Sequence, residues 1–262
     1  MEKQPVRLIV SGCCGRMGSL LIEEALRDPA HFRLAGGIEH AGHPQEGQPL
    51  PGNPALRVVS DPSVLLKNAD LLIEFSTPEA SLSHAKAAAQ MKVPMVIGTT
   101  GFSADQIGQL QKLAQAIPIF WSPNMSIGIV IVRRAITSIS KLLLSFGLAE
   151  QTKVSICETH HTQKKDSPSG TAKALAQELF KATGWLIKDE EIEARREGDV
   201  VGIHSVTFQS GSEKIRLEHE AVDRRVFAQG ALLVALGFRS LFKKPGWYGM
   251  DDFVSAVGKE KP

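Results

Sequence analysis

The segment from residue 6 to residue 26 constrains the fold more than any other, because an apolar run, a glycine-rich turn and a helical pattern follow one another without a break. Val6–Val10 leads directly into Ser11-Gly12-Cys13-Cys14-Gly15-Arg16-Met17-Gly18, and apolar residues then recur at helical spacing as far as Leu26. A strand, a glycine turn and a helix in this order are typical of a dinucleotide-binding unit. The glycines permit the tight turn, and backbone N–H groups at the helix start receive a pyrophosphate.

The glycine spacing departs from the GxGxxG pattern, because Cys14 stands at its second glycine and Met17 at its third. A tight turn that binds nothing is therefore a second interpretation. Glu39 ends the next apolar run, close to where an acid that hydrogen-bonds the adenosine ribose is expected. A carboxylate repels a 2′-phosphate, so Glu39 favours NADH over NADPH as the cofactor. The alternative is a solvated carboxylate at a strand end.

Up to about residue 126, apolar runs alternate with helical patterns. This alternation predicts βαβ units with right-handed crossovers, and hence an α/β fold with a Rossmann-like, doubly wound parallel sheet. Residues 46–54, rich in Gly and Pro, are expected to form a loop. The expected strands are Phe32–Ile38, Arg57–Val59, Leu71–Phe75, Pro94–Ile97 and Ile117–Trp121, and the expected helices include Pro78–Gln90 and Ala104–Ala114.

Two short loops, Gly98-Thr99-Thr100-Gly101 and Ser122-Pro123-Asn124-Met125, each follow a predicted parallel strand. Ligands of doubly wound sheets bind outside the carboxyl ends of the strands. Ordinary turn chemistry explains the two loops equally well. The residues expected to bind the cofactor are Gly12, Cys13, Cys14, Gly15, Arg16, Met17, Glu39, Gly98, Thr99, Thr100, Ser122, Pro123, Asn124 and Met125.

After residue 126 the pattern changes to that of an α+β domain. A long helical pattern runs from Ile127 to about Leu144, and a helix is expected over Thr171–Ala182. His204–Phe208 and Lys214–His219 alternate like the two strands of a hairpin. We therefore expect a dinucleotide-binding domain over 1–126, to which residues 236–262 return, and a second domain over 127–235.

The densest group of chemically active side chains lies between Glu158 and Thr171. It contains His160, His161 and Lys164, followed by a Pro-Ser-Gly-Thr helix start. Such a group supplies a proton carrier near neutral pH, a fixed cation and an anion-binding helix end. A polar surface loop with an ordinary N-cap at Ser169 is the alternative.

Composition limits the class of protein. Hydrophobic residues make up 43% of the chain and charged residues 22%, with a formal net charge of +2. No basic stripe suggests a nucleic-acid partner, and an apolar run such as Ile127–Val132 is too short to span a membrane. We expect Cys13, Cys14 and Cys157 to be reduced thiols of a cytoplasmic protein, with no bound metal. Oxidation of the neighbouring Cys13 and Cys14 is a hypothesis, since a helix N-terminus favours thiolate.

These motifs together resemble the 4-hydroxy-tetrahydrodipicolinate reductase family, also called dihydrodipicolinate reductase. The resemblance covers nearly the whole chain, and the block from His160 to Thr171 is its most specific part. Departures from the family's pattern, such as Ser167, Ile203 and Glu74, remove no catalytic group. The matching segments include Gly15–Gly18, Val96–Phe102, Asn124–Gly128, Glu158–Ala172, Gly198–Gly202, His219–Ala221, Phe227–Ala231 and Tyr248–Asp252.

The resemblance implies a reaction, roles for residues and an assembly. His160 would be the acid/base catalyst and Lys164 the proton donor, while His161, Gly170 and Thr171 would hold a small cyclic dicarboxylate substrate. NADH or NADPH would reduce this substrate in the diaminopimelate route to lysine. The second domain would also form a homotetramer.

Two other functions remain open at the level of the residues. One is another amino-acid-pathway oxidoreductase, such as an aspartate or homoserine dehydrogenase, which would turn over a linear amino acid. The other is a protein that senses NAD(H) without turnover.

Overall fold

The computed structural model describes residues 4–238 and 240–258, and these residues form two compact units. Unit 1 comprises Met1–Met125 and Arg225–Pro262, and unit 2 comprises Ser126–Arg224. The sequence predicted that the chain returns to unit 1 at residue 236. In the structure it returns at Arg225, where the helix Arg225–Phe238 begins. Part of the expected return segment, at residues 239 and 259–262, lies outside the described residues.

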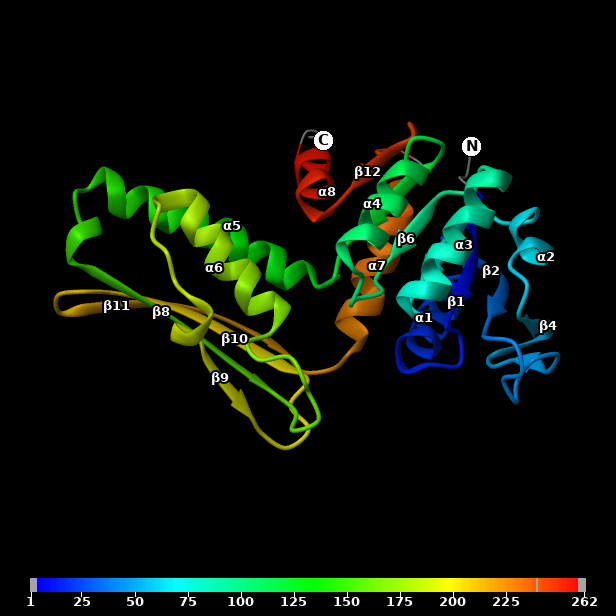
Figure 1. The fold of residues 1–262 in the computed structure, drawn as a ribbon, viewed down its shortest axis with the longest axis horizontal. Helices are drawn as coiled ribbons and strands as arrows, with labels where there is room; N and C mark the ends of the chain where they lie inside the picture. The colour runs from blue at the N-terminus through cyan, green and yellow to red at the C-terminus, as the bar shows by residue number, and fades with distance from the viewer. Residues whose placement is uncertain (1–3, 239, 259–262) are drawn as a thin grey trace. The chain divides into compact units, whose positions relative to one another are not determined.

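Unit 1 contains one eight-stranded sheet with the strand order β12-β7-β6-β5-β1-β2-β4-β3 (Figure 1). All neighbouring strands pair in parallel except β3 and β4. The strand order reverses between β1 and β5, which makes the edge beside β1 the switch point where doubly wound sheets bind ligands. The strands are β1 (Val6–Ser11), β2 (Phe32–Ile38), β3 (Pro49–Leu50), β4 (Asn53–Val59), β5 (Leu71–Glu74), β6 (Met95–Ile97), β7 (Pro118–Trp121) and β12 (Gly246–Tyr248).

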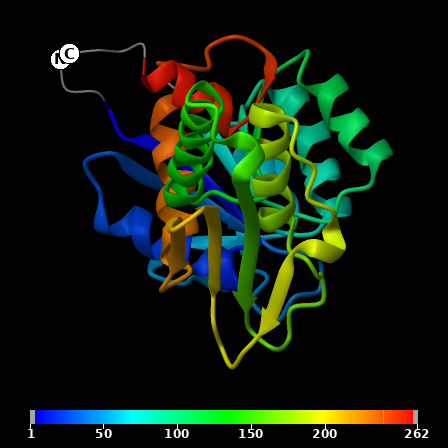
Figure 2. The same ribbon diagram turned by 90° about the vertical axis from the view of Figure 1, so that its left-hand side faces the viewer.

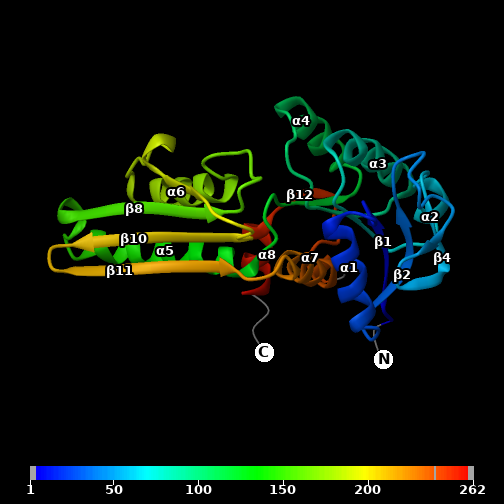
Figure 3. The same ribbon diagram turned by 90° about the horizontal axis from the view of Figure 1, so that it is seen from below.

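Helices cover both faces of this sheet, as Figure 3 shows. On one face α3 packs against α2 and α4, and on the other α1 packs against α7. Local sequence sets several helix ends: Thr77 caps α3 ahead of Pro78, and Ser103 forms a capping box with Gln106 at the start of α4. The helices are α1 (Arg16–Arg27), α2 (Ser63–Leu66), α3 (Pro78–Met91), α4 (Ala104–Leu113), α7 (Arg225–Phe238) and α8 (Met250–Val257).

Packing explains why α7 belongs wholly to unit 1. Its buried side chains include Ala228, Ala231 and Ala235, and it packs closely on α1. A Cβ atom at Gly230 would lie 1.8 Å from the Met125 carbonyl oxygen, so only glycine permits this approach. The helical pattern alone carries no information about which unit the helix covers.

Unit 2 is a four-stranded sheet, in the order β11-β10-β8-β9, covered on one face by two helices. Figures 1 and 2 show α5 and α6 on the same side of these strands. Val132, Ile136, Leu175, Val206 and Phe208 belong to the core between the helices and the sheet. The elements are α5 (Ile127–Ser145), the 3₁₀ turn Ala149–Gln151, β8 (Thr152–His160), α6 (Gly170–Thr183), the 3₁₀ turn Asp189–Glu191, β9 (Glu193–Arg196), β10 (Gly202–Ser210) and β11 (Glu213–Ala221).

The predicted hairpin is present, and its strands extend further than predicted. β10 and β11 pair antiparallel from Gly202 with Ala221 to Ser210 with Glu213, and Gly211 in the turn has φ +54°. Strand β9 was not predicted, because its sequence, Glu-Ala-Arg-Arg, has no apolar alternation. Within the described ranges, no helix combines the length and hydropathy needed to cross a membrane.

Candidate active site

The glycine turn of unit 1 has the geometry of a phosphate-binding turn. Gly12 has φ +70°, and a Cβ atom there would lie 2.3 Å from the Phe75 carbonyl oxygen. A Cβ atom at Gly18 would lie 2.0 Å from the Gly12 carbonyl oxygen, so Gly18 allows α1 to pack on the turn. The third glycine position of the motif is therefore Gly18, and assigning it to Met17 was wrong. Gly15, the N-cap of α1, has no side chain over the helix start.

Glu39 reaches back to this turn from the end of β2. Its Oε2 atom accepts a hydrogen bond from the Cys14 backbone N–H at 3.3 Å. Burial is the largest cause that raises the pKa of both Cys13 and Cys14, and the charge of Glu39 acts in the same direction. Burial and the Glu39 carboxylate thus act against the thiolate form that a helix N-terminus favours. Oxidation of these two thiols stays a hypothesis.

The loops after β6 and β7 end at the same edge of the sheet as the glycine turn, since these strands are parallel to β1 and β5. Thr99 is buried and its hydroxyl accepts hydrogen bonds from the Ser76 backbone N–H at 3.2 Å and the Ser81 hydroxyl at 2.8 Å. Thr100 is exposed. The Ser122 hydroxyl donates to the Asn124 carbonyl oxygen at 2.6 Å, which fixes the second loop.

A buried carboxylate beneath this edge had no predicted role. Glu74, at the end of β5, is fully buried and contacts His84 Nδ1 of α3 at 2.7 Å. Ser76 donates its hydroxyl to the same carboxylate at 2.5 Å, and Ser11 Oγ lies 3.2 Å from His84 Nδ1. The cluster ties the ends of β1 and β5 to α3, and with them the edge that carries the glycine turn.

The centre of the site in unit 2 is the carboxylate of Glu158, which is 1% exposed on β8. Its Oε1 atom accepts hydrogen bonds from the Ser169 backbone N–H at 3.0 Å and from two Arg196 nitrogens at 3.2 Å. Its Oε2 atom lies 2.6 Å from His160 Nδ1. The direction of this last contact is poor for a hydrogen bond, so we describe it as a close electrostatic contact.

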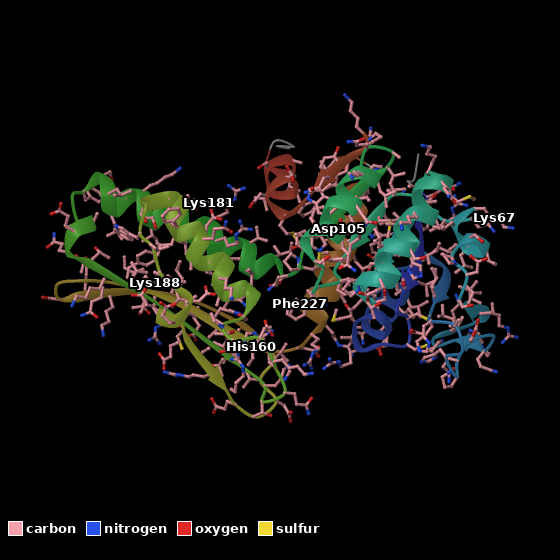
Figure 4. All side chains as sticks on the ribbon, viewed as in Figure 1. Lys67, Asp105, His160, Lys181, Lys188 and Phe227 are labelled. Carbon is pink, nitrogen blue, oxygen red and sulfur yellow. The ribbon has the colours of Figure 1, made fainter. Side chains whose placement is uncertain are left out.

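His160 lies at the end of β8 (Figure 4) and packs edge-on against His204 of β10, with ring centroids 4.9 Å apart. Burial lowers the pKa of His160, and the Glu158 charge opposes this shift. Burial also lowers the pKa of His204, to about 3. Both imidazoles are therefore neutral at neutral pH. A Cβ atom at residue 202 would lie 3.0 Å from His160 Nε2, so a side chain there would crowd that nitrogen.

The remaining predicted residues of this site lie in the loop after β8 and at the start of α6. Lys164 is half-buried and its Nζ atom lies 2.8 Å from Asp166 Oδ1, while Lys165 is exposed. His161 is half-buried next to His160. Gly170 and Thr171 open α6, whose N-cap Ser169 accepts a hydrogen bond from the Ala172 N–H.

Sequence reasoning assigned no role to Glu158, Arg196 or His204. Arg196 joins the parts of the site, since it also donates to the backbone carbonyls of Lys164 at 3.3 Å and Asp166 at 2.5 Å. A Glu two residues before a His on a strand places both side chains on one face, which was a usable signal. For Arg196 and His204 the sequence holds no such signal, because neighbouring strands bring them to the site.

Solved structures share this fold. A dipicolinate-bound dihydrodipicolinate reductase from Paenisporosarcina sp. TG-14 superposes with a TM-score of 0.73 at 22% identity, over 95% of this chain and 99% of that one. An aspartate semialdehyde dehydrogenase from Vibrio cholerae gives 0.57 at 13% identity, over 90% and 99%. At these identities the likeness concerns the fold alone.

Sequence comparison identifies the family. Models described as dihydrodipicolinate reductase, N-terminus and C-terminus, match residues 6–125 and 128–254. Two relatives named 4-hydroxy-tetrahydrodipicolinate reductase are each 37% identical to this chain. The match to the protein of Syntrophobacter fumaroxidans covers 94% of this chain and 97% of that protein. The match to the protein of Nitratidesulfovibrio vulgaris covers 87% of this chain and 92% of that protein.

Fold and sequence together define a two-domain oxidoreductase of the Rossmann type. The chain belongs to the dihydrodipicolinate reductase family, whose enzymes use NAD(P)H and act in lysine and diaminopimelate biosynthesis. The resemblance drawn from the motifs is therefore confirmed. Neither an aspartate or homoserine dehydrogenase nor a non-catalytic NAD(H) sensor agrees with this membership.

Proposed function

We propose that this chain reduces (2S,4S)-4-hydroxy-2,3,4,5-tetrahydrodipicolinate to tetrahydrodipicolinate, with one NAD(P)H and one proton consumed and one water released. The observation that carries the proposal is the juxtaposition, around Glu158, of an imidazole and the start of α6. In unit 2 this single carboxylate contacts His160 and the N-cap residue Ser169. A proton carrier and an anion-binding helix start are thus held by one group, which suits a dianionic substrate.

In unit 1 the glycine turn fits a dinucleotide. The left-handed Gly12, the tight packing at Gly18 and the uncapped start of α1 leave backbone N–H groups for a pyrophosphate. When bound, the cofactor supplies the hydride, and the protein supplies position, charge and protons. The proposed contacts come from residues 12–17, 39, 98–100 and 122–125.

In unit 2 we assign proton transfer to His160 and Lys164. His160 is neutral at neutral pH, and Glu158 at Nδ1 orients the ring so that Nε2 serves the substrate. Lys164 is the proton donor, and Asp166 restrains its ammonium group. The two carboxylates of the substrate need two separate sources of positive potential. The Lys164 ammonium group is one source. The start of α6 is the other, where His161, Gly170 and Thr171 hold the second carboxylate.

The experiment that tests this function follows NADH absorbance with the cyclic substrate generated by a synthase in the same cuvette. We expect NADH oxidation that depends on the synthase and on this chain. Oxidation with a linear amino acid but not with the cyclic substrate would contradict the proposal, as would NADH binding without turnover.

We further propose that Glu39 biases the cofactor site toward NADH. Its carboxylate already accepts the Cys14 N–H at the turn, where the adenosine ribose of a bound dinucleotide is expected. Replacing Glu39 with Ala or Arg should raise the catalytic efficiency with NADPH relative to NADH. If the ratio of the two efficiencies is unchanged in Glu39→Ala, the carboxylate does not contact the ribose.

Two properties of the whole protein complete the proposal. The three free thiols fit a protein of the reducing cytoplasm. The uncovered face of the sheet in unit 2 fits assembly into a homotetramer.

A further inference from the structure

The glycine turn of unit 1 holds three soft or anionic donor atoms close together. Cys13 Sγ and Cys14 Sγ are 3.8 Å apart. These two sulfurs and a Glu39 carboxylate oxygen all lie within 4.8 Å of one another. Nothing in the proposed reaction uses either thiol.

The spacing of the two sulfurs matches a tetrahedral thiolate site. Two thiolates bound to one Zn²⁺ at about 2.3 Å each, at the tetrahedral angle, are about 3.8 Å apart. A Glu39 carboxylate oxygen lies within 4.8 Å of both sulfurs, which makes it the candidate for a third ligand. Three protein ligands with one open position is an arrangement that zinc accepts.

We propose that Cys13, Cys14 and Glu39 bind one thiophilic divalent cation of the Zn²⁺ or Cd²⁺ class, and that this cation excludes NAD(P)H. The first part stands on the geometry of the turn alone. The second part rests on the proposed function, because it requires that the dinucleotide occupies this turn.

Access to the site comes from Cys14 and Glu39, which are half-exposed, whereas Cys13 is buried. Cation binding displaces the thiol protons, since the thiolate is the metal ligand. Glu39 would then be held by the cation, and so would be lost to both the Cys14 N–H and the ribose. Cation and cofactor therefore compete for the same carboxylate.

Glu158, His160 and His204 form the other donor cluster among the described residues. It suits a cation poorly, because Glu158 Oε2 and His160 Nδ1 are only 2.6 Å apart and Arg196 already binds the carboxylate. A signal that arises only from metal–sulfur bonds therefore distinguishes a cation bound at the turn from one bound at this second cluster.

The test titrates the full-length, reduced protein with Cd²⁺ and records the ultraviolet absorbance of the thiolate-to-metal charge transfer, without cofactor. We expect one Cd²⁺ per chain. Cys14→Ser and Glu39→Gln should each weaken Cd²⁺ binding at least about 10- to 100-fold, since even outer-shell partners of metal ligands have effects of this size. Cys157→Ser is the matched control and should leave Cd²⁺ affinity unchanged. Circular dichroism checks that each variant is folded.

A second arm adds NADH to the Cd²⁺-loaded protein. We expect the charge-transfer band to fall as NADH binds, and the apparent KM for NADH to rise with Cd²⁺ at constant kcat. No band, or a band that Cys14→Ser leaves intact, overturns the metal site. A band that NADH does not displace leaves the metal site in place and overturns its overlap with the cofactor.

Discussion

At the scale of single residues, the charge of Glu158 organises the site in unit 2. It is buried, and both Arg196 and the Ser169 N–H compensate its charge. Burial acts to raise the pKa of Glu158, but the hydrogen bonds from Ser169 and the positive charge of Arg196 outweigh burial and hold this pKa below its usual value. An ionised Glu158 keeps His160 in one orientation and ties it to the start of α6.

The assignment of Lys164 is open to a direct test, because a second lysine follows it. Lys164 is half-buried and contacts Asp166, whereas Lys165 is exposed. Lys164→Met should lower kcat by about 10²- to 10⁴-fold, the range of positioned acid/base groups, and Lys165→Met should have little effect. Steady-state kinetics of both variants decide the matter. Equal losses, or a larger loss at Lys165, would show that the proton donor has been placed one residue out.

His204 should make stability depend on pH. Its folded-state pKa is about 3, below the ordinary value of 6.5, so between these two values the unfolded chain binds a proton that the folded chain does not. Stability is therefore fully present above pH 6.5 and falls as the pH drops toward 3, with a limiting slope of about 1.4 kcal/mol for each step of one in pH. Glu158, whose pKa is also lowered, acts in the same direction.

The measurement is the melting temperature of the wild type and of His204→Asn between pH 7 and pH 4. We expect the wild type to lose stability more steeply than the variant across this range. Parallel curves would mean that another group causes the acid sensitivity.

At the scale of elements, the packing of α1 on the turn before it requires Gly18, although glycine normally destabilises a helix. Alanine in place of a helical glycine usually stabilises by about 0.5–1 kcal/mol. At Gly18 the added Cβ would lie 2.0 Å from the Gly12 carbonyl oxygen, so α1 or the turn must move. Gly18→Ala should therefore lower the melting temperature and weaken NADH binding.

Gly108 in α4 is the matched control, because a Cβ atom there meets nothing within 4 Å. Gly108→Ala should raise the melting temperature and leave NADH affinity unchanged. Calorimetry and NADH titration report both quantities. A stabilised Gly18→Ala with unchanged NADH affinity would contradict the packing argument.

At the scale of the whole molecule, the uncovered face of the sheet in unit 2 is where we expect chains to assemble. Ser155, Thr207 and Arg216 are paired across β8, β10 and β11, on the face opposite the apolar core. Sedimentation of the wild type should give the mass of a tetramer. Thr207→Arg should shift it toward smaller species, because it adds a long charged side chain to the middle of this face.

Ser145→Arg, at the exposed end of α5, serves as the control for added charge and should sediment like the wild type. A wild type that sediments as a monomer, or a Thr207→Arg variant that stays tetrameric, would contradict assembly through this face.

The sequence by itself determined what depends on neighbours along the chain. Strand β1, the turn at Gly12 and helix α1 follow from local spacing, and so do the capping box at Ser103 and the hairpin around Gly211. The grouping of His160, His161 and Lys164 was visible for the same reason. Alternating strands and helices also fixed the fold class, because parallel strands need crossovers.

Only the tertiary structure decided what depends on register between distant strands. His204 faces Glu158 because β10 pairs with β8 in that register, and Arg196 reaches the same carboxylate because β9 pairs with β8 beside His160. Gly18 took the place expected for Met17 because the Gly12 carbonyl oxygen lies against it. Pairing register and packing distance are set by the whole core, and no local pattern in the sequence carries them.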